Sequence, residues 1–337
     1  MRRIGLWTVL LVVAGALTAC QPHEEEGAQP TPYNLPTPSH FPSQNNIPAD
    51  NPMTEEGVAL GEKLFFDSQL IPTHSPLPTC CASCHHPEYS FEFGPEGTLE
   101  HLGTQHTMLP LINLVWNTVG LGWEGQVETL EDMVYLAYTD PAEIAADTAD
   151  VARRLQNDEA YRRLFKKAFG TDEPCFGLVQ KAIAQYVRSL VFCDTKFDRY
   201  LRGEEQLTQD ELNGYLLFVT EEGADCFHCH GGGANALFTT HLRYNNGLDA
   251  EDHGTFKAPT LRNIALTAPY MHDGRFRTLD EVIDFYSEGV QYSEQISPLM
   301  HHVMQGGVQL TEAEKAQLKA FLHTLTDNTL LQPEERP

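Results

Sequence analysis

The 337-residue sequence is poor in basic residues. Lysine and arginine together number 22, against 47 aspartates and glutamates, and the formal net charge at pH 7 is −25. Binding to nucleic acid or to an anionic lipid surface depends on clustered positive charge, so this balance argues against both kinds of partner. The negative net charge would instead favour a basic soluble partner. Hydrophobic residues make up 41% of the chain, which is enough to build real cores.

Long apolar runs are also scarce. Residues 6–17 form one such run, which follows two arginines and has the length of the apolar part of a secretory signal rather than of a stable membrane anchor. The run ends in LTAC at residues 17–20, which resembles a bacterial lipobox, where cleavage precedes a cysteine that is then lipidated. The alternative is an ordinary signal peptide that leaves Cys20 unmodified. Both predict export, and the lipobox predicts a periplasmic lipoprotein whose lipid anchor is its contact with the membrane.

Strand patterns are sparse as well, which predicts a mainly α fold. Residues 21–52 are rich in Pro, Glu, Asn, Ser and Thr and offer almost nothing to bury, so they predict a tether that follows a signal peptide at residues 1–20. The remaining chain of about 285 residues suits one large domain or two ordinary ones. Helices are predicted at residues 151–170 and 176–192, and after capping boxes that begin at Thr208 and Thr311.

The chain carries a duplicated unit. Each unit contains, in the same order, a G-x-x-L-F in a helical pattern, a C-x-x-C-H, a proline-led segment ending in asparagine, and a turn before a capped helix. The matching segments begin at Gly61, Cys81, Pro110 and Trp123 in the first unit and at Gly214, Cys226, Pro259 and His272 in the second. Two similar units predict two related domains that face one another, at residues 53–200 and 201–331.

The two C-x-x-C-H motifs are typical of covalently bound haem c. Two thiols form thioethers to the porphyrin, and the adjacent histidine ligates the iron from the same short turn. The motifs assign Cys81, Cys84 and His85 to one haem, and Cys226, Cys229 and His230 to the other. The alternative is a four-cysteine zinc site, but zinc does not require a histidine after each cysteine pair. We therefore predict two cytochrome c-like domains with one haem each, and Cys80 is the spare cysteine.

The two irons are not predicted to be equivalent. Residues 278–286 form a capped helical pattern whose inward face carries Tyr286, and the corresponding residue of the first unit is Ala137, which cannot ligate a metal. Tyr286 is thus a candidate axial ligand of the second haem, with Met271 as a rival and an ordinary core tyrosine as the simpler alternative. His101 or His106, in a glycine-bearing loop, could close the first haem.

Residues 57–327, and above all FKAPTLRNIALTAPYMHDGR at residues 256–275, resemble the bacterial di-haem cytochrome c peroxidases and the related MauG-type enzymes. The resemblance implies that peroxide reacts at the haem on His85 and that the haem on His230 stores or relays electrons. It also implies that the distal ligand of the relay haem is a methionine in ordinary peroxidases. Here Tyr286 occupies that place, as in the MauG-like state.

The resemblance assigns further roles. Trp123 corresponds to the tryptophan that conducts between the haems, and Glu143 to the distal acid–base glutamate, whose work is to move a proton between the two peroxide oxygens. The simpler alternatives are a core tryptophan and a surface carboxylate. His272 takes a structural role.

Two departures stand out. Met133 replaces a glutamine of the family. The interdomain calcium implied by the resemblance would use the carbonyls of Thr267 and Pro269, but Thr107 stands where an asparagine ligand is expected.

Three functions follow as hypotheses. The first is an exported peroxidase that reduces hydrogen peroxide to water with electrons from a small cytochrome c or cupredoxin, in a family whose peroxidases often form homodimers. The second is a MauG-like enzyme that uses peroxide-derived Fe(IV) to oxidise Trp or Tyr on a partner protein. The third is a non-catalytic di-haem electron carrier, in which both irons have two axial ligands from the protein.

Overall fold

The computed structural model describes residues 29–70, 80–97, 106–232, 235–250, 254–327 and 329. The signal-like segment, Cys20 and His101 lie outside the described residues. Within them the fold is mainly α, as predicted, and the only sheet is an antiparallel pair of two-residue strands, β1 (Arg243–Tyr244) and β2 (Phe256–Lys257). None of the helices in this part of the chain combines the length and apolar character that crossing a membrane requires.

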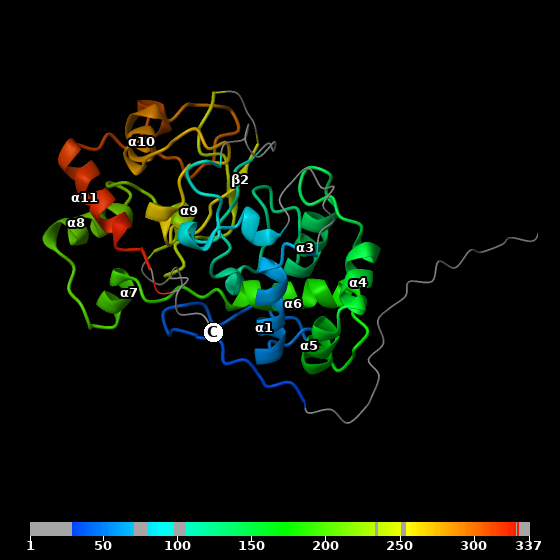
Figure 1. The fold of residues 1–337 in the computed structure, drawn as a ribbon. Coiled ribbons are helices and arrows are strands. Elements are labelled where there is room, and N and C mark those ends of the chain that lie inside the picture. The colour runs from blue at the N-terminus through cyan, green and yellow to red at the C-terminus, as the bar shows by residue number, and fades with distance from the viewer. Residues whose placement is uncertain are drawn as a thin grey trace, which may run out of the picture.

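The helices form two groups, which lie on the right and the left of Figure 1. The first group comprises α1 (Glu55–Phe66), α3 (Leu130–Thr139), α4 (Thr148–Asn157), α5 (Glu159–Phe169) and α6 (Phe176–Ser189). The second comprises α7 (Lys196–Leu201), α8 (Gln209–Phe218), α9 (Phe227–His230), α10 (Leu279–Asp284), the π-helical turn η5 (Phe285–Gly289) and α11 (Glu312–His323). Each group encloses its own apolar core, and a smaller apolar cluster lies between the groups.

Threonine side chains begin most of these helices. The predicted capping boxes at Thr208, Thr278 and Thr311 are confirmed, because each hydroxyl accepts a hydrogen bond from the third helical amide while the acidic residue there accepts from the cap. The prediction of one continuous helix over residues 151–170 was wrong. Asp158 has extended backbone (ψ 113°) and caps a new helix, so the segment divides into α4 and α5.

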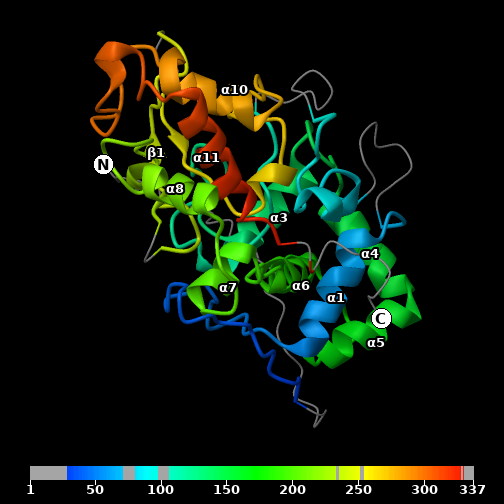
Figure 2. The ribbon, with the colours of Figure 1, turned by 90° about the vertical axis from the view of Figure 1, so that its left-hand side faces the viewer.

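The two G-x-x-L-F glycines occupy matching positions. α1 packs against α6 and α8 against α11, and Figure 2 shows the second of these pairs side by side. A Cβ atom on Gly61 would lie 2.0 Å from the carbonyl oxygen of Ala182, and one on Gly214 would lie 2.0 Å from that of Gln317. Glycine is therefore required in both helices, since any side chain would force the paired helices apart.

The segment at residues 29–52 buries more than we predicted for a tether. Phe41 is 7% exposed, stacks edge-on against Trp116 and lies under the guanidinium of Arg262. The amide of Asn46 donates to the carbonyls of Leu114 and Asn117. The expectation that this segment has almost nothing to bury was wrong for its described part, because one aromatic and a few amides are enough to fix it across both groups of helices.

Candidate functional site

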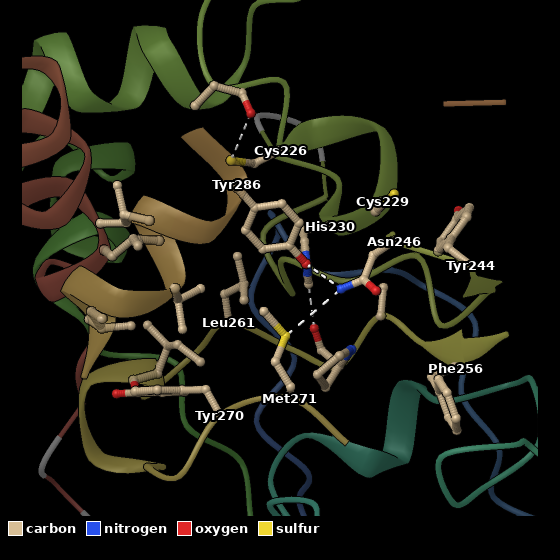
Figure 3. Close-up of a pocket in the computed structure, with 18 of the residues that line it drawn as sticks. Cys226, Cys229, His230, Tyr244, Asn246, Phe256, Leu261, Tyr270, Met271 and Tyr286 are labelled. Atoms are coloured by element: carbon tan, nitrogen blue, oxygen red, sulfur yellow. Dashed lines mark hydrogen bonds between the residues drawn. The ribbon is translucent and has the colours of Figure 1, made fainter. Parts of the chain in front are cut away.

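The second C-x-x-C-H opens onto a large, mostly apolar cavity. Cys226 stands before the short helix α9, which carries Cys229 and His230, and all three side chains line the cavity (Figure 3). The opposite wall comes from the segment around Pro269 and from α10 with η5. One short turn thus presents two thiols and an imidazole to the same space, which is the arrangement that haem attachment needs.

The imidazole of His230 is oriented by a hydrogen bond and is neutral. Its Nδ1 lies 3.1 Å from the carbonyl oxygen of Pro259, which accepts its proton and leaves Nε2 free to coordinate a metal. Burial lowers the pKa of His230 to about 4. Burial also raises the pKa values of Cys226 and Cys229 to about 12, so both thiols of the unmodified chain are protonated at neutral pH.

Two candidate axial ligands face this imidazole across the cavity. In Figure 3 the phenol oxygen of Tyr286 and the sulfur of Met271 both point towards His230. The side-chain amide of Asn246 lies between them and donates to the Tyr286 oxygen at 3.0 Å and to the Met271 sulfur at 3.8 Å. Burial raises the pKa of Tyr286 well above its usual value, and the Asn246 hydrogen bond opposes that shift.

The spacing of residues 278–286 predicted that Tyr286 lies in a regular α-helix, and this prediction was wrong. α10 ends at Asp284, and Tyr286 belongs to the π-helical turn Phe285–Gly289. A π turn changes the direction of a side chain relative to the preceding helical face, and such turns recur at functional sites.

Buried charge in the cavity wall also suits a haem. Lys257 is 7% exposed and lines the cavity, burial lowers its pKa to about 8, and within the described residues no carboxylate pairs with it. Haem carries anionic propionates, and a buried cation is stabilised by an opposite charge. The cavity therefore fits a covalently attached haem in both its attachment turn and its charge.

The first C-x-x-C-H is built on the same plan. His85 follows the 3-10 turn Cys81–Ser83, its Nδ1 lies 2.7 Å from the carbonyl oxygen of Phe91, and burial lowers its pKa to about 4. Burial raises the pKa of Cys81 to about 12 and that of Cys84 to about 11. Cys80 lies outside this set, with its sulfur 3.3 Å from the hydroxyl of Ser83.

Glu143 lies close to the first motif. The amide of Ile144 donates to the carbonyl of Ala137 at 3.1 Å, so Glu143 lies beside the residue that corresponds to Tyr286. Its carboxylate is near enough to Cys84 to raise the pKa of that thiol. The side chain reaches solvent, yet enough protein surrounds the carboxyl to raise its own pKa through desolvation, helped by Asp140. A carboxyl of raised pKa suits proton transfer near neutral pH.

Trp123 lies where the two groups of helices meet. Its indole Nε1 donates to the carbonyl of Thr107 at 2.8 Å, and its backbone carbonyl accepts from the amide of Lys257 in β2. The indole lines the cavity of the second motif, and its ring centroid is 6.4 Å from that of His272, which stacks on Phe256 at 3.7 Å. An oxidisable aromatic from the first half therefore reaches the second site.

The candidate calcium residues meet at the same junction. Thr267 and Pro269 both line the cavity. Thr107 is 5% exposed, and its hydroxyl donates to the carbonyl oxygens of Met271 at 3.0 Å and His272 at 3.4 Å. The threonine hydroxyl thus holds the backbone at Met271 and His272. Calcium binding stays a prediction.

Sequence reasoning missed two cavity residues besides Lys257, which are Asn246 and Glu92. It also missed His241, which does not line this cavity. None of the three belongs to a motif with a recognisable spacing. Glu92 is 3% exposed in the cavity wall, and its Oε2 has no hydrogen-bond partner among the described residues. The buried Nε2 of His241 also lacks one there, and burial lowers the pKa of this imidazole to about 4.

Comparisons with known proteins show the family of this chain. Residues 55–206 match the family model described as "Di-haem cytochrome c peroxidase". The chain is 32% identical to the methylamine utilization protein MauG of Methylophilus methylotrophus, with 83% of this chain and 85% of that protein covered. It is 30% identical to the cytochrome c551 peroxidase of Nitrosomonas europaea, with 82% and 81% covered.

Among solved structures, the chain resembles a MauG-like protein associated with microbial copper homeostasis. The TM-score is 0.78 and the identity is 34%, with 90% of this chain and 98% of that one covered. Relatives named as peroxidases and relatives named MauG are thus similar to nearly the whole described chain. The chain is an oxidoreductase that belongs to the family of di-haem cytochrome c peroxidases and MauG proteins.

Proposed function

We propose that this protein is an exported di-haem peroxidase that reduces hydrogen peroxide to water with two electrons from a small cytochrome c or cupredoxin. The observation that carries the proposal is the difference between the two sites. A phenol oxygen faces His230 across its cavity, whereas the corresponding residue near the first motif is Ala137, with Glu143 beside it. In this proposal peroxide reacts at the first site, where alanine replaces the phenol and an acid lies nearby.

In this proposal the two halves are cytochrome c-like domains related by internal duplication. The matching glycines support it, as do two matching asparagines. Asn113 and Asn263 both have left-handed backbone (φ 56° and 59°), and both begin a 3-10 turn. The backbone amide of Asn113 donates to the carbonyl of Leu190, and its side-chain oxygen accepts from the amide of Phe192. In the same way Asn263 donates to Leu325 and accepts from the amide of Asp327.

Two covalently bound haems would supply the redox chemistry, one held by Cys81, Cys84 and His85 and the other by Cys226, Cys229 and His230. Glu143 would accept a proton from the peroxide oxygen that binds first and return it to the oxygen that leaves. Trp123 would couple the halves, because its indole lies in the wall of the second cavity. Tyr286 would help to hold the second haem from the side of the cavity that faces His230.

Oxidation of a reduced cytochrome c after addition of peroxide tests this proposal. Glu143→Gln removes the titrating proton and keeps the shape, and we expect the rate to fall by about 10²–10⁴-fold, the range typical of a lost general acid–base. Glu128→Gln, at an exposed position of the same half, serves as the control and should leave the rate unchanged. Equal rates in both variants would remove Glu143 from the mechanism.

A second candidate is oxidation of Trp or Tyr residues on a partner protein. Tyr286 favours it, because an anionic oxygen ligand stabilises oxidised iron better than a thioether does. Incubation with peroxide and candidate partners, followed by mass spectrometry, separates the two functions. Partner residues gaining oxygen without cytochrome turnover would support this candidate, whereas rapid cytochrome turnover with unmodified partners would support the peroxidase.

We also propose a periplasmic location with a lipid on Cys20. Labelling with a radioactive fatty acid in wild-type cells and in cells that carry Cys20→Ala tests the anchor. We expect label only in the wild type, and label in both would place the lipid elsewhere.

A further inference from the structure

Three side chains beside the second C-x-x-C-H converge without a role in haem attachment. Glu221 lies in the turn between α8 and α9, His228 lies between Cys226 and Cys229, and His301 lies just before the 3-10 turn Val303–Gln305. Each offers one carboxylate oxygen or ring nitrogen, and these three atoms all lie within 4.8 Å of one another. Two segments about 70 residues apart in the sequence thus supply one cluster of donors.

A buried carboxylate orients the central histidine. Oδ1 of Asp225 is 2.6 Å from Nδ1 of His228, and the Asp225 side chain is only 6% exposed. With Nδ1 donating to this carboxylate, Nε2 carries the free lone pair, and it faces the Glu221 carboxylate at 3.4 Å. A carboxylate behind an imidazole whose other nitrogen faces further donors is the usual arrangement around a protein-bound metal.

The two segments are held together independently of any metal. Nε2 of His302 donates to the backbone carbonyl of Glu221 at 2.9 Å, and Gln305 hydrogen-bonds Nδ1 of the same imidazole at 3.0 Å. The rings of His228 and His301 meet edge-on with centroids 5.1 Å apart. The donors are therefore arranged in advance, which lowers the entropy that binding would cost.

Haem attachment does not explain this cluster. In the first motif Cys80 and Ser83 occupy the positions of Asp225 and His228, and they make only a sulfur–hydroxyl contact of 3.3 Å. The first motif thus forms its own short helical turn with neither an imidazole nor a carboxylate at these two positions, so the C-x-x-C-H pattern does not require these groups.

We propose that Glu221, His228 and His301 bind one divalent cation of the zinc or copper class. Two imidazoles and a carboxylate form a donor set that such ions favour over calcium or magnesium, which prefer oxygen alone. Asp225 is a positioning residue. Asp225 and His301 also line the cavity that holds Cys226, so the cation lies at its rim and adds positive charge beside the second haem site.

Equilibrium dialysis of the full-length holoprotein against Zn²⁺, followed by metal analysis, tests this site. Because the chain carries other histidines, the informative quantity is the difference between variants, with iron content confirming that both haems are attached. We expect the double variant Glu221→Gln/His301→Ala to bind one Zn²⁺ fewer per chain than the wild type. His323→Ala, which removes an exposed histidine at the end of α11, should bind as much as the wild type.

The positioning role has its own measurement. Asp225→Asn keeps the shape and suits the left-handed backbone of this residue (φ 54°). We expect it to weaken Zn²⁺ binding about 10–100-fold, the usual effect of losing the carboxylate behind a metal-bound histidine. Equal zinc uptake by the wild type and the double variant, at matched iron content, would overturn the proposal whether or not the protein proves to be a peroxidase.

Discussion

Arg262→Met should destabilise the protein more than the loss of any surface ion pair. Arg262 and Asp198 are both fully buried and form two parallel hydrogen bonds of 2.9 and 2.6 Å. Arg262 also donates to the carbonyls of Ala236 at 2.7 Å and Phe192 at 3.2 Å, and its guanidinium lies 4.5 Å from the ring centroid of Phe41. Methionine fills much of the volume but satisfies none of these groups.

The expected loss of stability follows from the interactions that Asp198 would keep after the substitution. Asp198 would keep hydrogen bonds from Thr195 and His40 but lose its buried cation. Removing one partner of a buried pair costs about 3–5 kcal/mol, because the other charge stays uncompensated. For domains of this size each kcal/mol lowers the melting temperature by about 2–4 °C, so we expect a fall of about 6–20 °C.

Thermal unfolding followed by far-UV circular dichroism measures this change. The matched control is Arg162→Met, because Arg162 pairs with Asp172 at 2.6 Å while the two side chains are 44% and 51% exposed. An exposed pair contributes about 0–1 kcal/mol, so the control should fall by no more than about 4 °C. Adding Asp198→Asn to Arg262→Met should recover part of the loss by removing the stranded charge. Equal shifts for Arg262→Met and Arg162→Met would refute the reasoning.

Four further outcomes follow from the same contacts. Tyr286→Phe should change the electron paramagnetic resonance signal of one ferric haem, whereas Tyr292→Phe, at a side chain 58% exposed, should change neither signal. Trp123→Phe should slow electron transfer between the haems in stopped-flow absorbance, and an unchanged rate would argue for a purely structural indole. Gly214→Ala should lower the free energy of unfolding by about 1–3 kcal/mol in urea, because the new methyl group meets a carbonyl oxygen, and unchanged stability would show that α8 and α11 can separate freely. Burial by itself would raise the pKa of Asp198, but Arg262 outweighs burial and holds this pKa at about 2, below the ordinary 3.8. The ionised Asp198 should therefore contribute its full stabilisation above pH 3.8, and this stabilisation should disappear as the pH falls through about 2. Acid unfolding of the wild type and of Asp198→Asn can measure the difference.

Several features could be predicted from sequence because each depends on neighbours in the chain. The haem motifs span five residues each, a threonine cap bonds an amide three positions on, and the scarcity of strand patterns indicated a mainly α fold. The family followed from the same local motifs and from their order. The prediction of one helix over residues 151–170 was wrong because the apolar periodicity continues across Asp158, whereas the backbone at Asp158 is extended and the helix is interrupted there.

By itself, the sequence predicted two haem attachment motifs and determined which residues cap three of the helices. It also showed that the two repeated units differ at Tyr286 and Ala137. Only the tertiary structure decided that Asn246 meets the Tyr286 oxygen, that Phe41 packs against the Arg262 guanidinium, and that His301 approaches the second haem motif. The physical reason is that local hydrogen bonding and side-chain spacing are written within a few consecutive residues. Contacts between distant segments depend instead on how whole helices and loops pack, which no short stretch of sequence specifies.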